Sequence, residues 1–102
     1  MQVTVSHHVD ASAEGADGSC EFSYEYDLFT FSDETASFLV RSYSGELKEA
    51  HFQARLDGSE RHFLTERDLR HPLFIEAAAY LRTNGKPSLS WLGTDGYLPL
   101  PG

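Results

Sequence analysis

A strict alternation of apolar and polar residues runs through residues 49–56, and it constrains the fold more than any other feature. The apolar positions are Ala50, Phe52, Ala54 and Leu56. Side chains of a β-strand point alternately to its two faces, so the pattern is typical of a strand with one buried and one exposed face. Asp57-Gly58 follows directly, and this pair favours a two-residue type I′ hairpin turn. We therefore expect a hairpin over residues 49–64 in which Gln53 faces His62.

Two more segments with strand patterns precede this hairpin, at residues 20–31 and 35–43. In the first, Tyr26 and Leu28 share one face, whereas Phe29 and Phe31 fall on the other. Either a bulge lies near Leu28, or the strand is buried on opposite faces at its two ends. Ser32-Asp33-Glu34 predicts a turn, and a two-residue loop at 33–34 would pair Tyr26 with Arg41. Residues 20–64 therefore predict an antiparallel β-meander of about four strands.

The remainder of the chain predicts one main helix and a short β-hairpin. Pro72 favours a helix start, because proline suits the first helical position, and Asn84-Gly85 favours its end. After this helix, at about 72–84, residues 89–92 and 97–100 read as two short strands. A further short strand is expected at residues 2–6. Residues 7–19, which are rich in Ala, Ser, Gly and Asp, are expected to form a flexible loop. The expected fold is α+β, in a single small domain spanning residues 1–102.

Negative charge is concentrated in the first part of the chain. Residues 1–40 contain eight acidic residues and no Lys or Arg, and the formal net charge of the chain is −8. A surface of one sign attracts a partner of the opposite sign, and it repels nucleic acid and anionic lipid. The N-terminus lacks the pattern of a secretory signal, and the single cysteine, Cys20, fits a reducing compartment. We expect a cytoplasmic protein that binds neither nucleic acid nor membrane.

Motifs for catalysis or cofactor binding are weak. No nucleophile-elbow or phosphate-binding glycine motif is present, and Asp10, Glu14 and Asp17 lack the ligand spacing of a calcium loop. His51 and His62 are expected on one exposed face of the hairpin, diagonal to each other, within reach of a shared Zn²⁺. Two solvated histidines remain the simpler interpretation, so we expect neither a metal nor a cofactor.

The aromatic and acidic residues of the first hairpin are the strongest candidates for binding. One helix covers one face of a small sheet, so part of the second face needs cover from the C-terminal hairpin, a second copy of the chain, or another protein. Tyr and Arg are enriched at protein interfaces. The candidate partner-binding residues are Tyr24, Glu25, Tyr26, Asp27, Asp33, Glu34, Arg41 and Tyr43.

These observations favour a non-enzymatic domain that binds a basic protein partner through its acidic, aromatic-rich N-terminal surface. Small acidic α+β domains recur among bacterial inhibitors and immunity-like proteins, and this likeness is one of size and charge. Six Arg against two Lys also favours a GC-rich bacterial genome. Two alternatives stay open. One is a structural homodimer, and the other is a small metal- or ligand-dependent enzyme that uses His51 and His62.

Overall fold

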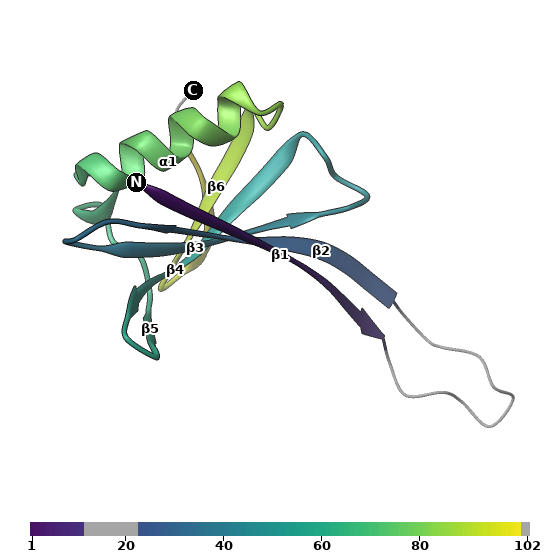
Figure 1. Cartoon of the computed structure of the whole chain (residues 1–102), viewed down its shortest axis with the longest axis horizontal. Coiled ribbons are helices and arrows are strands. Elements are labelled where there is room, and N and C mark those ends of the chain that lie inside the picture. The colour runs from purple at the N-terminus through teal and green to yellow at the C-terminus, as the bar shows by residue number, and fades with distance from the viewer. Residues whose placement is uncertain (12–22, 101–102) are drawn as a thin grey trace, which may run out of the picture.

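A computed structural model describes residues 1–11 and 23–100 of the 102-residue chain, with side chains described for residues 1–9 and 25–100. This part of the chain contains seven β-strands, one α-helix and one 3-10 turn, η1 (Asp68–Arg70) (Figure 1). The strands are β1 (Gln2–Ala11), β2 (Ser23–Ser32), β3 (Ser37–Tyr43), β4 (Glu49–Asp57), β5 (Glu60–His62), β6 (Ser88–Gly93) and β7 (Gly96–Pro99), and the helix is α1 (Pro72–Thr83).

All seven strands form one sheet, in the order β1-β2-β3-β4-β6-β7, with β5 paired to β4. The α+β class is confirmed, but a sheet of about four strands is wrong, because β1 and the C-terminal hairpin β6–β7 join it. Strands β4 and β6 are parallel, from the Glu49–Ser88 pair to the Phe52–Trp91 pair. Parallel neighbours need a crossover connection, and α1 lies within it.

The hydrophobic core lies between α1 and one face of the sheet (Figure 1). Phe74 of α1 stacks on Phe52 of β4 with ring centroids 4.1 Å apart, and it meets Phe38 of β3 edge-on at 5.4 Å. Ala77 and Ala78 are also buried, and their small side chains let the helix approach the strands closely. The core residues of the sheet are Phe29, Phe31, Phe38, Val40, Ala50, Phe52, Leu89 and Trp91.

The predicted ends of the helix are confirmed within one residue. His71 is the N-cap, and its Nδ1 accepts a hydrogen bond of 3.1 Å from the Leu73 N–H, while Pro72 occupies the first turn. Gly85 follows the C-cap with φ of 87°, a left-handed conformation that glycine adopts without a steric cost. Because His71 accepts through Nδ1, this cap requires a ring that is not protonated at Nδ1.

The first hairpin, β2–β3, has a longer loop than expected, so its predicted register is wrong. Tyr26 faces Tyr43 and Ser32 faces Ser37, which leaves four residues in the loop. The cause is the Asp33 side chain, whose Oδ1 accepts hydrogen bonds from the Thr35 N–H at 2.7 Å and the Ala36 N–H at 2.9 Å. A shift of two positions keeps every side chain on its expected face.

Strand β2 is buried on opposite faces at its two ends, which was one of the two alternatives. Phe29 and Phe31 are buried on the face covered by α1, whereas Tyr26 is buried on the other face with 6% exposure. The irregularity in this region lies elsewhere, between Leu39 and Val40 in the β3–β4 pairing.

The second hairpin, β4–β5, also differs from its predicted register. Asp57 faces Glu60 and Arg55 faces His62, so the turn falls at Gly58-Ser59 rather than at Asp57-Gly58. Gly58 carries the positive φ, 62°, that this turn requires. The predicted pairing of Gln53 with His62 is therefore wrong.

Strand β1 is longer than expected and forms one edge of the sheet beside β2. Residues 7–11 continue the strand, so a loop beginning at residue 7 is wrong, and the rest of that predicted loop lies outside the described residues. Val5 and Val9 are more than half exposed on this strand. Together, β1 and β2 project beyond the part of the sheet that α1 covers (Figure 1).

Candidate binding surface

The sheet face opposite α1 has no helix over it in the described part of the chain (Figure 1). Strand alternation identifies the side chains on this open face. Val40 of β3 and Phe52 of β4 belong to the core, so Arg41 and His51, which pair with each other, point the opposite way. Ser90 of β6 pairs with His51 and lies on the same face.

Five rings form a continuous row across this open face, from one edge of the sheet to the other. The rings are those of His8 of β1, Tyr26 of β2, Tyr43 of β3, His51 of β4 and Tyr97 of β7. We call these five residues together with Arg41 the aromatic row. Successive ring centroids are 5.5, 5.9, 6.3 and 5.5 Å apart. These separations are those of aromatic pairs in contact.

Arg41 lies within the row and packs its guanidinium on the tyrosines. The guanidinium carbon is 4.4 Å from the Tyr26 ring centroid, and Nη1 donates a hydrogen bond of 3.4 Å to the Tyr43 hydroxyl. The Arg41 Nε is buried with no hydrogen-bond partner among the described residues, a cost that the cation–π contact opposes. This end of the row is consequently packed, with Tyr26 almost fully buried.

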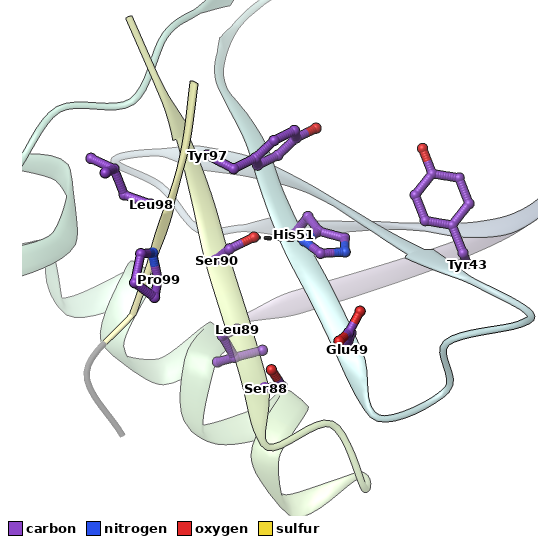
Figure 2. A pocket seen from close by; sticks show the side chains of 9 residues that line it. All are labelled: Tyr43, Glu49, His51, Ser88, Leu89, Ser90, Tyr97, Leu98 and Pro99. Carbon is purple, nitrogen blue, oxygen red and sulfur yellow. Dashed lines mark hydrogen bonds between the residues drawn. The ribbon is translucent and has the colours of Figure 1, made fainter. Parts of the chain in front are cut away.

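The other end of the row borders an open cavity of about 390 Å³. Figure 2 shows Tyr43 and Tyr97 on either side of His51, with Glu49 below it on the same strand. The other lining residues come from β6 and β7: Ser88, Leu89, Ser90, Leu98 and Pro99. Tyr97 is 53% exposed, so this end of the row, unlike the Tyr26 end, is accessible to another molecule.

Hydrogen bonds hold His51, the ring next to Tyr97 in the row, in place. His51 Nδ1 and Ser90 Oγ are 2.6 Å apart (Figure 2). The Tyr97 hydroxyl donates to Gln53 Oε1 at 3.0 Å, and Gln53 Nε2 donates to the His51 carbonyl at 3.3 Å. These bonds connect β4, β6 and β7, so the shape of this end of the cavity is set by the parallel β4–β6 pairing.

Two carboxylates lie beside the same histidine. Glu46 Oε2 is 3.8 Å from His51 Nε2. A hydrogen bond between Glu46 and Glu49, together with the repulsion of their charges, raises the pKa of Glu49. One of the two carboxyl groups therefore retains its proton more readily than an isolated glutamate, and a cation placed beside both would remove this repulsion.

Ser90, His51 and Glu46 are connected in the order of a nucleophile, a base and a carboxylate. However, Ser90 lies in a strand paired on both sides, to β4 and to β7, so it is not on the exposed turn that presents a catalytic serine. We interpret the Ser90 bond as one that orients the imidazole.

The residues predicted to bind a partner do not form one surface. Tyr26, Arg41 and Tyr43 lie together on the open face, as expected from their alternation. Glu25 and Asp27 point to the opposite face, where each carboxylate lies 2.7 Å from a nitrogen of His7. These hydrogen bonds, first that of Asp27 and then that of Glu25, raise the pKa of His7.

The other predicted acidic residues lie farther away. Asp33 and Glu34 occupy the loop at the opposite end of β2 from Glu25, and Asp33 is engaged with Thr35 and Ala36. The side chain of Tyr24 lies outside the described side chains. The acidic half of the predicted surface is therefore separate from its aromatic half.

The predicted diagonal pair of His51 and His62 is not formed, because the β4–β5 register places His62 opposite Arg55. Each histidine instead has its own carboxylates. Glu46, Glu49 and His51 bring ligand atoms within 4.8 Å of one another, and so do Asp57, Glu60 and His62 on the exposed β4–β5 turn. Carboxylate and imidazole ligands suit Zn²⁺, so each group has a donor set that such an ion could use.

Four residues of the observed site were not among the predicted site residues: Glu46, Gln53, Ser90 and Tyr97. The C-terminal hairpin, which carries Tyr97, was expected only as possible cover for the second face, and the parallel pairing of β4 with β6 leaves no signal in local residue patterns.

Comparisons of this chain with protein-family models, curated proteins and solved structures returned no match. Among the described residues, no helix is both long enough and apolar enough to cross a membrane.

Proposed function

We propose that this chain is a non-enzymatic protein-binding domain that holds a basic partner protein on its open sheet face, in an inhibitor or immunity-like role. The observation that supports it most strongly is the aromatic row, which runs unbroken across the face that α1 leaves uncovered. Tyrosine and arginine are enriched at protein interfaces because each combines a large contact area with a polar end. Large exposed apolar patches are uncommon on monomeric proteins, and they often mark interaction sites.

Charge favours a basic partner. The formal net charge of the chain is −8, and Glu46 and Glu49 add local negative charge at the accessible end of the row. Such a field speeds the encounter with a positively charged protein and disfavours nucleic acid and anionic membranes. The single cysteine, Cys20, fits a reducing cytoplasm as the place where this complex forms.

Affinity capture with three baits tests the proposal. The baits are the wild-type chain, a Tyr43→Ala/Tyr97→Ala double variant, and Ile75→Ala as the matched control on the outer side of α1, where Ile75 is 56% exposed. We expect a basic protein from the lysate of the encoding organism to be retained at low salt by the wild type and by the control, and to be lost from the double variant. Equal retention of the same proteins by all three baits contradicts the proposal.

A second experiment separates local from overall charge once the partner is in hand. Glu46→Lys with Glu49→Lys changes the net charge by the same amount as Glu25→Lys with Asp27→Lys, but only the first pair lies beside the row. We expect the first pair to slow association at low salt by a larger factor than the second. Identical association rates for both variants would refute a role for the Glu46–Glu49 pair in steering.

A structural homodimer is the second candidate, and the observation that favours it is the exposed edge of the sheet. Strand β1 pairs only with β2 in the described part of the chain, and Val5 and Val9 are exposed on it. Two such edges related by a two-fold axis can extend the sheet across both copies. Light scattering at micromolar concentration tests this: a mass of 11.4 kDa counts against the dimer. A doubled mass that Val5→Lys/Val9→Lys returns to the monomer value supports it.

A further inference from the structure

The cavity at the β7 end of the aromatic row is lined by aromatic rings and by a carboxylate. Tyr43 and Tyr97 flank it with ring faces and edges, and Glu49 supplies a carboxylate from the strand between them (Figure 2). His51 lies at the centre, fixed by its bond to Ser90. Aromatic rings beside carboxylates are the surroundings that an organic cation prefers, because ring faces and carboxylates both attract positive charge.

The charges of the residues around the cavity sum to a negative value, which favours the binding of a cation. Glu46 and Glu49 contribute two negative charges when ionised. Arg41, which donates a hydrogen bond to the Tyr43 hydroxyl, contributes one positive charge. The carboxylate oxygens of Glu46 and Glu49 lie within 4.8 Å of each other beside His51. A cation bound beside them therefore replaces an unfavourable contact between like charges with a favourable one.

We propose that this cavity binds the guanidinium group of an arginine side chain presented by the partner protein. The proposal rests on the protein-binding function above and names the contact that anchors it. A guanidinium is planar, so it can stack on a tyrosine or histidine ring while its N–H groups bind a carboxylate in a bidentate manner. Arg41 already makes the stacking half of this arrangement on Tyr26, 4.4 Å from the ring centroid, on the same sheet face.

A bare metal ion fits the cavity less well than an arginine side chain. Glu46, Glu49 and His51 could supply three ligands, since their ligand atoms lie within 4.8 Å of one another. However, only Glu49 and His51 of these three residues line the space of about 390 Å³. The rings of Tyr43 and Tyr97 and the apolar Pro99 also line it, and they have no role in binding a metal. An arginine side chain uses both, since its apolar stem packs on such residues while its charged end meets the carboxylate.

Titration of the isotope-labelled full chain with small probes, followed by NMR, tests the proposal. The probe is Nα-acetyl-arginine amide, and its matched control is Nα-acetyl-citrulline amide, which has the same shape without the charge. We expect saturable binding of the arginine probe in the millimolar range, with the largest shifts at His51, Ser90 and Tyr97. The citrulline probe should bind at least about fivefold more weakly, since it lacks the charge that strengthens hydrogen bonds and ring contacts.

Two chain variants show whether the binding belongs to this cavity. Glu49→Gln should weaken the arginine probe by about fivefold or more, whereas Glu76→Gln, a carboxylate removed from the exposed side of α1, should leave it unchanged. Equal weakening by both variants would show that the probe responds only to net charge, and it would overturn the proposal. No saturable binding, or equal binding of the two probes, would overturn it as well.

Zinc alone provides the remaining comparison. Tight, stoichiometric binding of Zn²⁺ that shifts His51 and is lost in Glu49→Gln, with no arginine binding, would assign the cavity to a metal and refute the proposal. This failure is distinguishable from failure of the protein-binding function. If the arginine probe does not bind but Tyr43→Ala/Tyr97→Ala still abolishes capture of a partner, the open face is the interface and only the arginine anchor is wrong.

Discussion

Replacing one aromatic side chain on each face of the sheet by alanine should lower folding stability strongly on the core face and weakly on the open face. Phe74 is 2% exposed and lies 4.1 Å from Phe52, so Phe74→Ala removes a buried ring and leaves a cavity. Such substitutions cost about 3–5 kcal/mol of folding free energy. A domain of this size has only about 5–15 kcal/mol to lose.

Tyr97→Ala is the matched change on the open face. Tyr97 is 53% exposed, and its replacement by alanine removes one hydrogen bond, to Gln53, and one ring contact, to His51. These contacts are half in solvent, so we expect a loss of about 1 kcal/mol or less. For a chain of about 100 residues, 1 kcal/mol corresponds to about 4–8 °C in Tm, so Phe74→Ala should lower Tm several times more than Tyr97→Ala does.

Urea and thermal unfolding followed by circular dichroism measure both variants, with an unchanged urea dependence as the check that unfolding stays two-state. If Tyr97→Ala destabilises the chain as much as Phe74→Ala does, the aromatic row is a second core rather than a surface kept free for a partner, and the reasoning is refuted.

Three further predictions concern the titrating groups and the first hairpin. The pKa of His7 is raised by hydrogen bonds to Asp27 and Glu25. The contribution of His7 to folding stability is therefore complete below the unfolded histidine value of about 6.5, and it is lost as pH rises through the folded pKa. An NMR titration should show that Asp27→Asn lowers this pKa. The raised pKa of Glu49 means that the folded state binds this proton more tightly, so stability falls as pH rises through it, and Glu46→Gln should return the pKa toward an ordinary glutamate value. The pKa of Asp33 is lowered, first by the Thr35 N–H, so its contribution is present above the unfolded value and lost as pH falls through the folded one; Asp33→Ala should remove this acid-side dependence from the urea midpoint.

Local structure was the part of the fold that the sequence predicted well. Pro72 and Gly85 mark the ends of α1, and Gly58 has the positive φ expected at the second hairpin. These features depend on one or two residues whose backbone preferences are strong. Alternation in β4 likewise placed Ala50 and Phe52 in the core.

Registers and non-local pairings could not be predicted in the same way. The β2–β3 loop is four residues long because of side-chain bonds to Asp33, which a count of turn residues does not include. Residues 7–11 lack a strong strand pattern, yet they form part of β1, where His7 binds Glu25 and Asp27 across the strands. Such contacts are visible only once the register is known.

The candidate surface was predicted in part for the same reason. Tyr26, Arg41 and Tyr43 were expected together because they alternate on neighbouring strands, and they do share the open face. Glu25 and Asp27 alternate out of phase with them, so they cannot belong to that face. The β7 end of the row depends on the parallel β4–β6 pair, which joins segments separated by the whole of α1.

Site-specific photo-crosslinking tests most directly whether the open face is the binding surface. Benzoylphenylalanine is placed at the position of Tyr97 in one protein and of Ile75 in another, two positions with 53% and 56% exposure in the parent chain on opposite sides of the sheet. The captured partner is then irradiated with each. We predict a crosslink from position 97 and none from position 75. A crosslink from position 75 alone, or equal crosslinking from both, would contradict the assignment of the open face as the interface.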